Sequence, residues 1–352
     1  MITHAPLRAA ACSILLALAG ACALSACGDG ADEPGATETP APVQSAPKSD
    51  APPAKPDKLL VGVVAKSDSN PVFQAARTGA EDAAAELSEE HGVEITLSWQ
   101  TPDREDAQRQ AQFIDQLVVD GADGITVSAS DADVLRDAVN RAVDQGVEVV
   151  TFDSDVPGSK RFAYYGIDDM ECGRVLMREL VKHMGEQGVV AVLAGNQNAP
   201  NLQKRVAGVR EEAAKHPGIT IKDVYYHGET APEAAAKVQQ VQSANPEITG
   251  WAMVGGWPLF TENALDGVYQ SAKVVSVDHL PVELGYVRNG QVQALIGQDC
   301  YGWGYQTVTM LVEKILEGKA PAQEINTFEL PIVTAENVDE YADVWKKWLR
   351  DE

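Results

Sequence analysis

From residue 58 onward, the chain alternates short runs rich in Val, Ile and Leu with longer amphipathic segments. This alternation is typical of parallel strands linked by crossover helices. In the first half of the region, the pattern predicts strands over 59–65, 94–99, 124–128, 148–152 and 163–166. Helices are predicted between these strands, over 72–90, 106–120 and 132–145.

The same alternation restarts after residue 166. A helix is predicted over 170–184, and further strands over 189–194, 219–226, 250–254, 273–278 and 294–297, again with helical stretches between them. We therefore expect an α/β protein with two successive doubly wound parallel-sheet units. Because right-handed crossovers place helices on both faces of such sheets, loops that bind ligands gather at the carboxyl ends of the strands.

Charge and composition exclude several classes of protein. The 352 residues include 28 Lys and Arg against 52 Asp and Glu, which gives a formal net charge of -24. Such a surface repels phosphate backbones, so we expect no nucleic-acid partner and no basic face that docks on anionic lipid. The 5 Cys, three of them at positions 12, 22 and 27, are too few for a disulfide-rich miniprotein.

The first 27 residues resemble a bacterial lipoprotein signal peptide. Arg8 precedes an apolar stretch over 9–26, and the stretch ends in Leu-Ser-Ala before Cys27. The resemblance implies cleavage before Cys27 and a lipid on its sulfur, so that the membrane is contacted through the anchor alone. The alternative is an uncleaved membrane anchor, for which the stretch is short. Either reading places the remainder in the periplasm or elsewhere outside the cytoplasm, where thiols oxidise.

Residues 28–57 are rich in Pro, Ala, Ser and acids and almost lack large apolar side chains. Such a segment cannot bury a core, and we expect an extended tether between the lipid and the folded part. Removing residues 1–57 takes away more acidic than basic residues but leaves the rest strongly acidic. The negative charge is therefore a property of the folded part.

Polar residues follow the predicted strands where each one ends. Such segments are Lys66–Phe73, Asp153–Asp155, Gly195–Asn198, Gly255–Pro258 and Asp278–His279. Carboxylates, amides and guanidinium groups each form two hydrogen bonds, which suits hydroxyl groups that both donate and accept. Aromatic faces cover the C–H side of a sugar ring. The pattern therefore favours a carbohydrate ligand over a lipid.

The usual enzyme motifs are absent from the sequence. We find no G-x-S-x-G, H-E-x-x-H, P-loop or G-x-G-x-x-G pattern, and the six His stand singly without metal-ligand spacing. We therefore expect no catalytic activity, no cofactor and no metal. Paired acids also occur in glycosidases, but these acids lie in no recognisable catalytic frame.

Residues from about 58 to 350 resemble the periplasmic sugar-binding proteins of ABC importers, specifically the ribose-binding type with the type I periplasmic binding fold. The resemblance rests on the order and spacing of short segments, namely 70–73 (NPVF), 149–153 (VVTFD), 166–169 (GIDD) before Gly173, Arg205 and Gly208 after Gly195, 245–247 (NPE), 275–278 (VSVD) and 297–298 (GQ). A repressor of the lac type shares this fold, but here a signal and tether occupy the place of its DNA-binding domain.

The resemblance implies a fold of two lobes joined by a three-segment hinge. The crossings would lie near 166–168, 298–299 and 328, with an N-terminal lobe of 58–167 and 299–327 and a C-terminal lobe of 168–298 and 328–352. It also implies a monomer that closes around a sugar and delivers it to a membrane permease.

Ligand contacts are carried over from the family residue by residue. Asn70, Asp153 and Asp278 would bind hydroxyl groups, and Phe73 would stack on the ring. Arg205 would donate from the second lobe, and Gln298 would bond beside a hinge segment.

At four places the chain departs from the ribose type. Ser154 stands in place of Arg, Lys66 in place of a small hydroxyl residue, Glu229 near an aromatic position, and Gly255 in place of an amide. Trp257 then supplies a stacking surface. We include Lys66, Ser154, Glu229 and Trp257 in the predicted site, and infer that the ligand is not ribose itself.

Several of these residues have a structural alternative. Asp168, Asp169 and Asn70 each precede a helix and suit an N-cap. Phe73 and Trp257 suit a core, and Arg205 suits a solvated helix face. Asp153 and Asp278 end buried apolar strands, where a carboxylate requires partners.

The family fold also bears on Cys172 and Cys300, which lie beside the first and second crossings. Because the crossings run side by side in this fold and the compartment is oxidising, we expect a disulfide between them. The alternative is two buried free thiols.

The expected ligand is a neutral pentose, hexose or polyol. Lys66 near Arg205 also suggests a sugar acid or a furanosyl quorum signal, since two cations could hold a carboxylate. A different class of function is a sensory receptor, which would present the closed form to a chemoreceptor or a sensor kinase.

Overall fold

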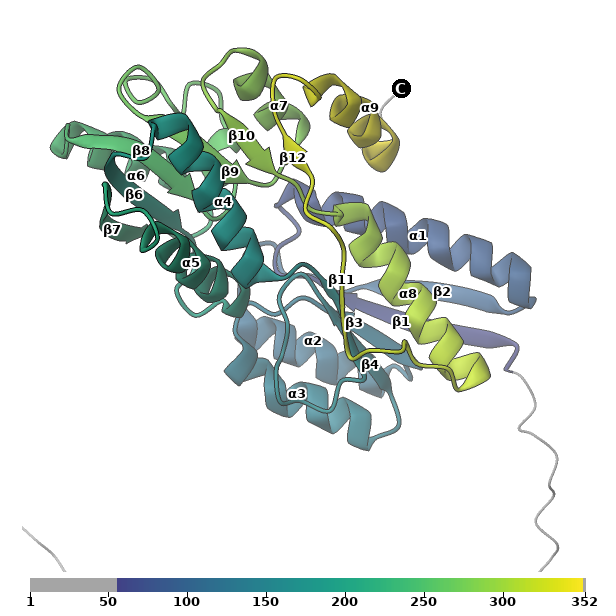
Figure 1. Ribbon diagram of the computed structural model, residues 1–352. Coiled ribbons are helices and arrows are strands. Elements are labelled where there is room, and N and C mark those ends of the chain that lie inside the picture. Colours follow the sequence, from purple (N-terminus) through teal and green to yellow (C-terminus); the bar gives the residue numbers. More distant parts are fainter. Residues whose placement is uncertain (1–55, 351–352) are drawn as a thin grey trace, which may run out of the picture. The chain divides into compact units, whose positions relative to one another are not determined.

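The computed structural model describes residues 56–350, which contain two six-stranded sheets (Figure 1). The first sheet has the order β11-β5-β4-β3-β1-β2, and every neighbouring pair is parallel. Its strands are β1 (Lys58–Val64), β2 (Glu94–Trp99), β3 (Gly124–Val127), β4 (Glu148–Phe152), β5 (Ala163–Gly166) and β11 (Ile325–Thr327).

The second sheet repeats this arrangement in the order β12-β10-β9-β8-β6-β7. Its strands are β6 (Gly188–Ala194), β7 (Ile219–Tyr226), β8 (Ile248–Met253), β9 (Lys273–Val277), β10 (Ala294–Ile296) and β12 (Ile332–Val333). Only β12 runs antiparallel to its neighbour within the described residues. The two doubly wound parallel-sheet lobes predicted from the sequence are confirmed, with β12 as a short antiparallel edge.

Helices cover both faces of the first sheet (Figure 1). The helices α1 (Pro71–His91) and α8 (Cys300–Glu317) pack against one another and bury apolar side chains such as Val61 and Val150 on one face. The helices α2 (Ala107–Val119) and α3 (Ala132–Asp144) bury Val64 and Val149 on the other. Successive strand residues therefore point to opposite apolar layers, as a strand covered on both faces requires.

The second sheet is covered in the same way. The helices α4 (Asp169–Met184) and α5 (Pro200–Ala213) share one apolar layer with residues such as Val192. The opposite layer holds Leu193 and Trp251 and is closed by α6 (Ala231–Ala244), the 3₁₀ turn η1 (Trp257–Phe260), α7 (Pro281–Arg288) and α9 (Val338–Leu349). The strands and helices with predicted ranges all appear within two residues of those bounds.

The chain passes between the sheets at three places. It leaves the first sheet after β5 and enters α4, returns after β10 through α8, and leaves again between β11 and β12. The residues between these elements are 167–168, 297–299 and 328–331. The two sheets are therefore joined by three short segments, which agree in position with the crossings implied by the family resemblance.

The predicted disulfide is wrong. Cys172 and Cys300 are both free and buried. Cys172 packs with Leu176 and Met177 under the second sheet, whereas Cys300 packs in a different apolar cluster with Phe73 and Trp303. Although the crossings are neighbours, the two sulfur atoms do not meet, because the two side chains pack in different apolar clusters. Burial raises the pKa of Cys172 to about 12.

The predicted signal peptide, the lipidated Cys27 and nearly all of the predicted tether lie outside the described residues. Between residues 56 and 350, no helix is both long enough and apolar enough to cross a membrane.

Candidate functional site

Two carboxylates lie at equivalent positions in the two sheets, each just after the end of a strand. Asp153 follows β4 and Asp278 follows β9, and these strands hold the same place in the strand order of their sheets. Both residues have a positive φ, 52° for Asp153 and 77° for Asp278. Such backbone is uncommon outside glycine and occurs where surrounding structure enforces it, often at binding sites. The sharp turn directs both side chains to the carboxyl ends of the strands.

The Asp153 carboxylate accepts hydrogen bonds from two side chains, one after β3 and one in α5. Ser128 donates from Oγ at 2.7 Å and Asn201 donates from Nδ2 at 3.2 Å. The Asp278 carboxylate accepts the Gly256 N–H at 2.9 Å and a bond from the Gln298 amide. Burial raises the pKa of Asp278, although Arg205 and these two donors act in the opposite direction.

Arg205, on α5, is buried rather than solvated, so the alternative of an exposed helix charge is wrong. Its guanidinium donates to Asp169 at 2.9 Å, to Gln298 Oε1 at 2.8 Å and to the Val254 carbonyl at 3.1 Å. Its Nη2 also lies 4.0 Å from Asp153 Oδ1. Arg205 thus joins the carboxylate network of the first sheet to that of the second.

The two acids before α4 have different roles. Asp168 caps the helix by accepting the Glu171 N–H at 3.0 Å, as expected. Asp169 instead forms the buried ion pair with Arg205, and burial raises its pKa to about 6 despite that pair. Asp169 therefore positions Arg205.

Lys66 lies just past β1, and only 4% of its surface is exposed. Its Nζ donates to Asn201 Oδ1 at 3.4 Å and lies 3.7 Å from Glu105 Oε1. Burial acts to lower the pKa of Lys66, but the charges of Asp153, Glu229 and Glu105 outweigh it and raise the pKa. Its charge is already balanced by protein carboxylates.

Glu229 follows β7 and also has a positive φ, of 57°. Its Oε1 accepts the Asn196 N–H at 2.8 Å. Burial raises the pKa of Glu229 to about 8, and Glu105 adds to this effect while Lys66 opposes it. Glu105 comes from the segment before α2 and Glu229 from the second sheet, so their contact links loops of both sheets.

These side chains surround one cavity of about 30 Å³, which holds roughly one or two water molecules. Nine of the ten predicted ligand residues line it: Lys66, Asn70, Phe73, Asp153, Arg205, Glu229, Trp257, Asp278 and Gln298. Because the polar groups bind one another here, they leave little free volume between them.

Ser154 is the predicted site residue that the structure places elsewhere. It is fully buried, does not line the cavity, and its Oγ has no hydrogen-bond partner among the described residues. β4 ends at Phe152, and the positive φ of Asp153 turns the chain before Ser154. With Asp153 directed to the cavity, Ser154 points into the protein.

The aromatic residues serve the core and the cavity together. Phe73 packs against Phe152 and Trp303, with ring centroids 6.3 and 6.0 Å apart, and Trp257 contacts His227 at 5.1 Å. Both Phe73 and Trp257 nevertheless line the cavity. Asn70 likewise combines two roles, because it caps α1 by accepting the Val72 N–H at 3.2 Å.

Gly255 is required by Trp257. A Cβ built at Gly255 would lie 2.1 Å from a ring carbon of Trp257. The ring occupies the space that a side chain at residue 255 would fill. A side chain at residue 255 and the present position of the Trp257 ring therefore exclude one another.

The sequence analysis did not predict three residues at the site. Asn201 and Trp303 line the cavity, and Glu105 lies beside Lys66. Asn201 follows the loop that ends β6, so the rule that placed Asp153 at a strand end extends to it. Glu105 and Trp303 carry no such signal, because the first lies in an irregular segment and the second inside α8.

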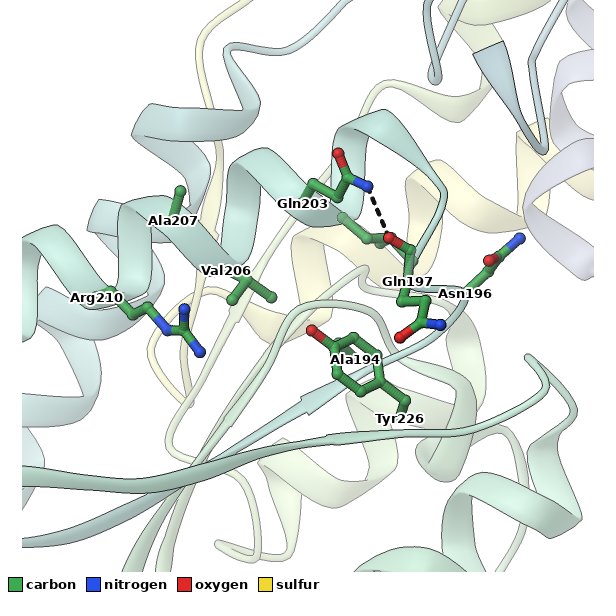
Figure 2. A pocket seen from close by; sticks show the side chains of 9 residues that line it. Ala194, Asn196, Gln197, Gln203, Val206, Ala207, Arg210 and Tyr226 are labelled. Atoms are coloured by element: carbon green, nitrogen blue, oxygen red, sulfur yellow. Dashed lines mark hydrogen bonds between the residues drawn. The ribbon is translucent and has the colours of Figure 1, made fainter. Parts of the chain in front are cut away.

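A larger groove lies apart from this cavity, between α5 and the end of β7 (Figure 2). It has a volume of about 380 Å³ and is lined by Val206, Ala207, Arg210 and Tyr226, with Gln197 and Gln203 at one side. None of the predicted ligand residues lines it. Within residues 56–350, no group of three or more His, Cys, Asp or Glu is arranged to hold a metal ion.

Comparison with known proteins gives a consistent picture. The model of a family described as "periplasmic binding protein domain" matches residues 61–320. The D-ribose/D-allose-binding protein of Pseudomonas aeruginosa is 25% identical over 284 residues, which cover 76% of this chain and 86% of that protein. The xylitol-binding protein of Mycolicibacterium smegmatis is 22% identical over 258 residues, covering 70% of each chain.

A solved structure is similar over the same region. It is a solute-binding protein of an ABC transporter from Burkholderia graminis in complex with D-arabinose. It is 25% identical, superposes with a TM-score of 0.76, and the alignment covers 82% of this chain and 99% of that one.

Proposed function

Because the chain belongs to the periplasmic binding protein family, a family of sugar-binding proteins of the ABC importer type, we propose that it captures a neutral sugar or polyol between its two sheets. The sheets with their helices act as two lobes, divided at the three crossing segments. Closure brings Asp153 and Lys66 of one lobe against Asn201 and Arg205 of the other. The chain makes and breaks no covalent bond.

The observation that carries this proposal is the polar network between the lobes. Asp153, Asn201, Arg205, Gln298 and Asp278 supply both donors and acceptors, and they now bind one another. A hydroxylated ligand replaces these bonds with equivalent ones, so closure around it leaves no buried polar group unpaired. Phe73 and Trp257 cover the ring from the sides.

The charges in the cavity favour a neutral ligand over a sugar acid. Two cations, Lys66 and Arg205, line it with the carboxyl groups of Asp153, Glu229 and Asp278. Arg205 is paired with Asp169, and Lys66 lies beside Glu105. A ligand carboxylate would have to displace these internal partners and would face Asp153 and Asp278.

The N-terminal sequence bears on where in the cell the protein acts. The lipoprotein-like sequence before Gly28 supports a lipid anchor on Cys27 and an extracytoplasmic location, most simply the periplasm. Delivery to an ABC permease follows from the importer type of the family. Presentation of the closed form to a chemoreceptor or sensor kinase is the alternative, and a permease gene next to this gene favours import.

A thermal-shift screen of the full chain tests the proposal. The panel contains D-ribose, D-allose, D-arabinose and xylitol, with D-gluconate as an anionic comparison. We expect at least one neutral compound to raise Tm by several degrees and to compact the protein in small-angle scattering, while D-gluconate does neither. Chemical conversion of the bound compound, or preference for the acid, contradicts the proposal.

A further inference from the structure

A second cavity adjoins the one described above. Its volume is about 230 Å³, and it shares Lys66, Asn70, Phe73, Glu229 and Trp257 with the inner cavity of about 30 Å³. We call the two the inner and the outer cavity. Phe73 and Trp257 line both cavities, so a ligand held by Asp153 and Asp278 has open space beside it in one direction.

The outer cavity is built from loops that follow strands of both sheets. The segment after β1 contributes Ser67 and Ser69, and the segment before α2 contributes Arg104 and Glu105. The second sheet contributes the loop after β7, with Gly228 and Thr230, and Glu233 at the start of α6. Like the inner cavity, it is formed only when the loops of the two lobes meet.

One buried acceptor at the inner end of the outer cavity lacks a donor. Glu105 Oε1 has no hydrogen-bond partner among the described residues, since Lys66 Nζ lies 3.7 Å away, beyond hydrogen-bond distance. Glu229 adds a second carboxyl group, whose Oε1 accepts the Asn196 N–H and whose contact with Glu105 helps to raise its pKa. A buried acceptor without a donor costs stability, and a ligand O–H removes that cost.

The charges there exclude an anionic partner for these groups. Lys66 faces the carboxyl groups of Asp153, Glu229 and Glu105. Its Nζ also donates a hydrogen bond to Asn201. Arg104 is exposed at the rim, and Glu233 accepts the Gly228 N–H at 3.2 Å. A group bearing hydroxyls and no negative charge therefore fits the wall made by Glu105 and Glu229.

We infer that the ligand is a sugar or polyol extended by a further neutral, hydroxyl-bearing group, such as a second sugar unit, and that this group lies in the outer cavity against Glu105. This inference rests on the proposed function and narrows it. The ring lies with Asp153 and Asp278, and the extension passes Phe73 and Trp257 to reach Glu105.

The test compares matched ligands on the full chain by isothermal titration calorimetry. D-ribose, D-xylose, D-glucose, D-galactose and D-mannose are each paired with their methyl glycosides and with disaccharides that contain them; glucosamine and glucuronic acid test charge. We expect at least one disaccharide to bind at least tenfold more tightly than its parent monosaccharide. Glucuronic acid and glucosamine should bind no better than glucose.

Variants locate the extension. Glu105→Gln removes one acceptor, and Thr230→Phe fills the outer cavity with a larger side chain. For each we expect the ratio of monosaccharide to disaccharide Kd to fall about tenfold. Glu89→Gln, a matched change on the exposed face of α1, leaves that ratio unchanged.

If monosaccharides bind as tightly as every extended ligand, the inference is wrong while the proposed function stands. A preference for glucosamine or glucuronic acid contradicts the neutral extension. If neither these sugars nor the compounds of the thermal-shift screen bind, the proposed function fails, and this inference with it. Equal Kd ratios in Glu105→Gln and Glu89→Gln remove Glu105 from the site.

Discussion

Asp153 and Asp278 are structural counterparts: each follows the third strand in the order of its sheet, and each donates its backbone N–H to the neighbouring strand, at 3.2 Å to Tyr165 O and at 2.9 Å to Ile296 O. Both then turn through a positive φ, so that their carboxylates face the same inner cavity. Two similar α/β units thus supply one acidic group each, and a bound hydroxylated ring can be held from both lobes.

Replacing either carboxylate should abolish ligand binding without unfolding the protein. Asp153→Ala and Asp278→Ala each remove an acceptor of charged hydrogen bonds, worth about 1.5–3 kcal/mol per bond, so the ligand-induced rise in Tm should vanish. A thermal-shift assay with the best ligand from the screen measures this. Asp266→Ala, an exposed position in the second lobe, should keep the full rise; binding retained in both cavity variants contradicts the site.

Arg205→Met should destabilise the fold. The change leaves the Asp169 carboxyl buried without its partner, and breaking such a pair typically costs about 3–5 kcal/mol. The cost is smaller at acidic pH, because the Asp169 pKa is already raised to about 6. Urea unfolding followed by circular dichroism measures it.

The matched control lies on the same helix. Arg210 is exposed on α5, and Arg210→Met should change the free energy of unfolding by less than about 0.5 kcal/mol. Equal effects of the two substitutions would show that the ion pair contributes nothing to stability.

Ligand affinity should depend on pH through Glu229. Burial in the closed form raises its pKa to about 8 from an ordinary value of 4.5, with Glu105 and Lys66 facing it. A carboxyl group whose pKa is raised by closure of the lobes takes up a proton. Its contribution to the free energy of closure is therefore complete below pH 4.5 and is lost as the pH rises through 8. Affinity measured from pH 5 to 9 should therefore decrease toward high pH.

Glu229→Gln tests the origin of this dependence. Its amide is neutral at every pH, so the decrease should disappear if Glu229 causes it. A slope that persists in the variant assigns the proton uptake to another group.

The two cysteines should react only after unfolding. Burial raises the pKa of Cys172 to about 12 and that of Cys300 well above its ordinary value. Because the thiolate is the reactive form, alkylation of the native protein should be slow at both positions. Mass spectrometry after alkylation in denaturant without reductant should show both peptides labelled. Unlabelled peptides that become reactive only with reductant would restore the disulfide.

Gly304→Ala should strongly destabilise the protein. A Cβ at residue 304 would lie 1.8 Å from the Ala76 carbonyl oxygen, so α8 and α1 would have to move apart. The backbone cannot move aside as a flexible side chain can. We therefore expect the free energy of unfolding to fall by more than about 3 kcal/mol. Gly285→Ala, in α7 with nothing within 4 Å of the new Cβ, should instead be neutral or stabilising by about 0.5–1 kcal/mol. Thermal or urea unfolding compares the two variants.

The sequence by itself determined the two α/β units and most of the candidate site. Apolar runs and helical periodicity located the strands, and the carboxyl-end rule placed Asp153 and Asp278 where they lie. These features are local, since burial and backbone geometry repeat along the chain with fixed periods. Ser154 was assigned to the site because it stands in place of an Arg of the ribose type, but the structure buries it away from the cavity.

Only the tertiary structure decided which side chains from distant parts of the chain come into contact. It paired Arg205 with Asp169, brought Glu105 beside Lys66 and Trp303 beside Phe73, and kept the sulfur atoms of Cys172 and Cys300 in separate cores. These contacts join residues far apart in the chain. They depend on how helices and loops pack against the sheet of each lobe, and neither composition nor spacing carries that information.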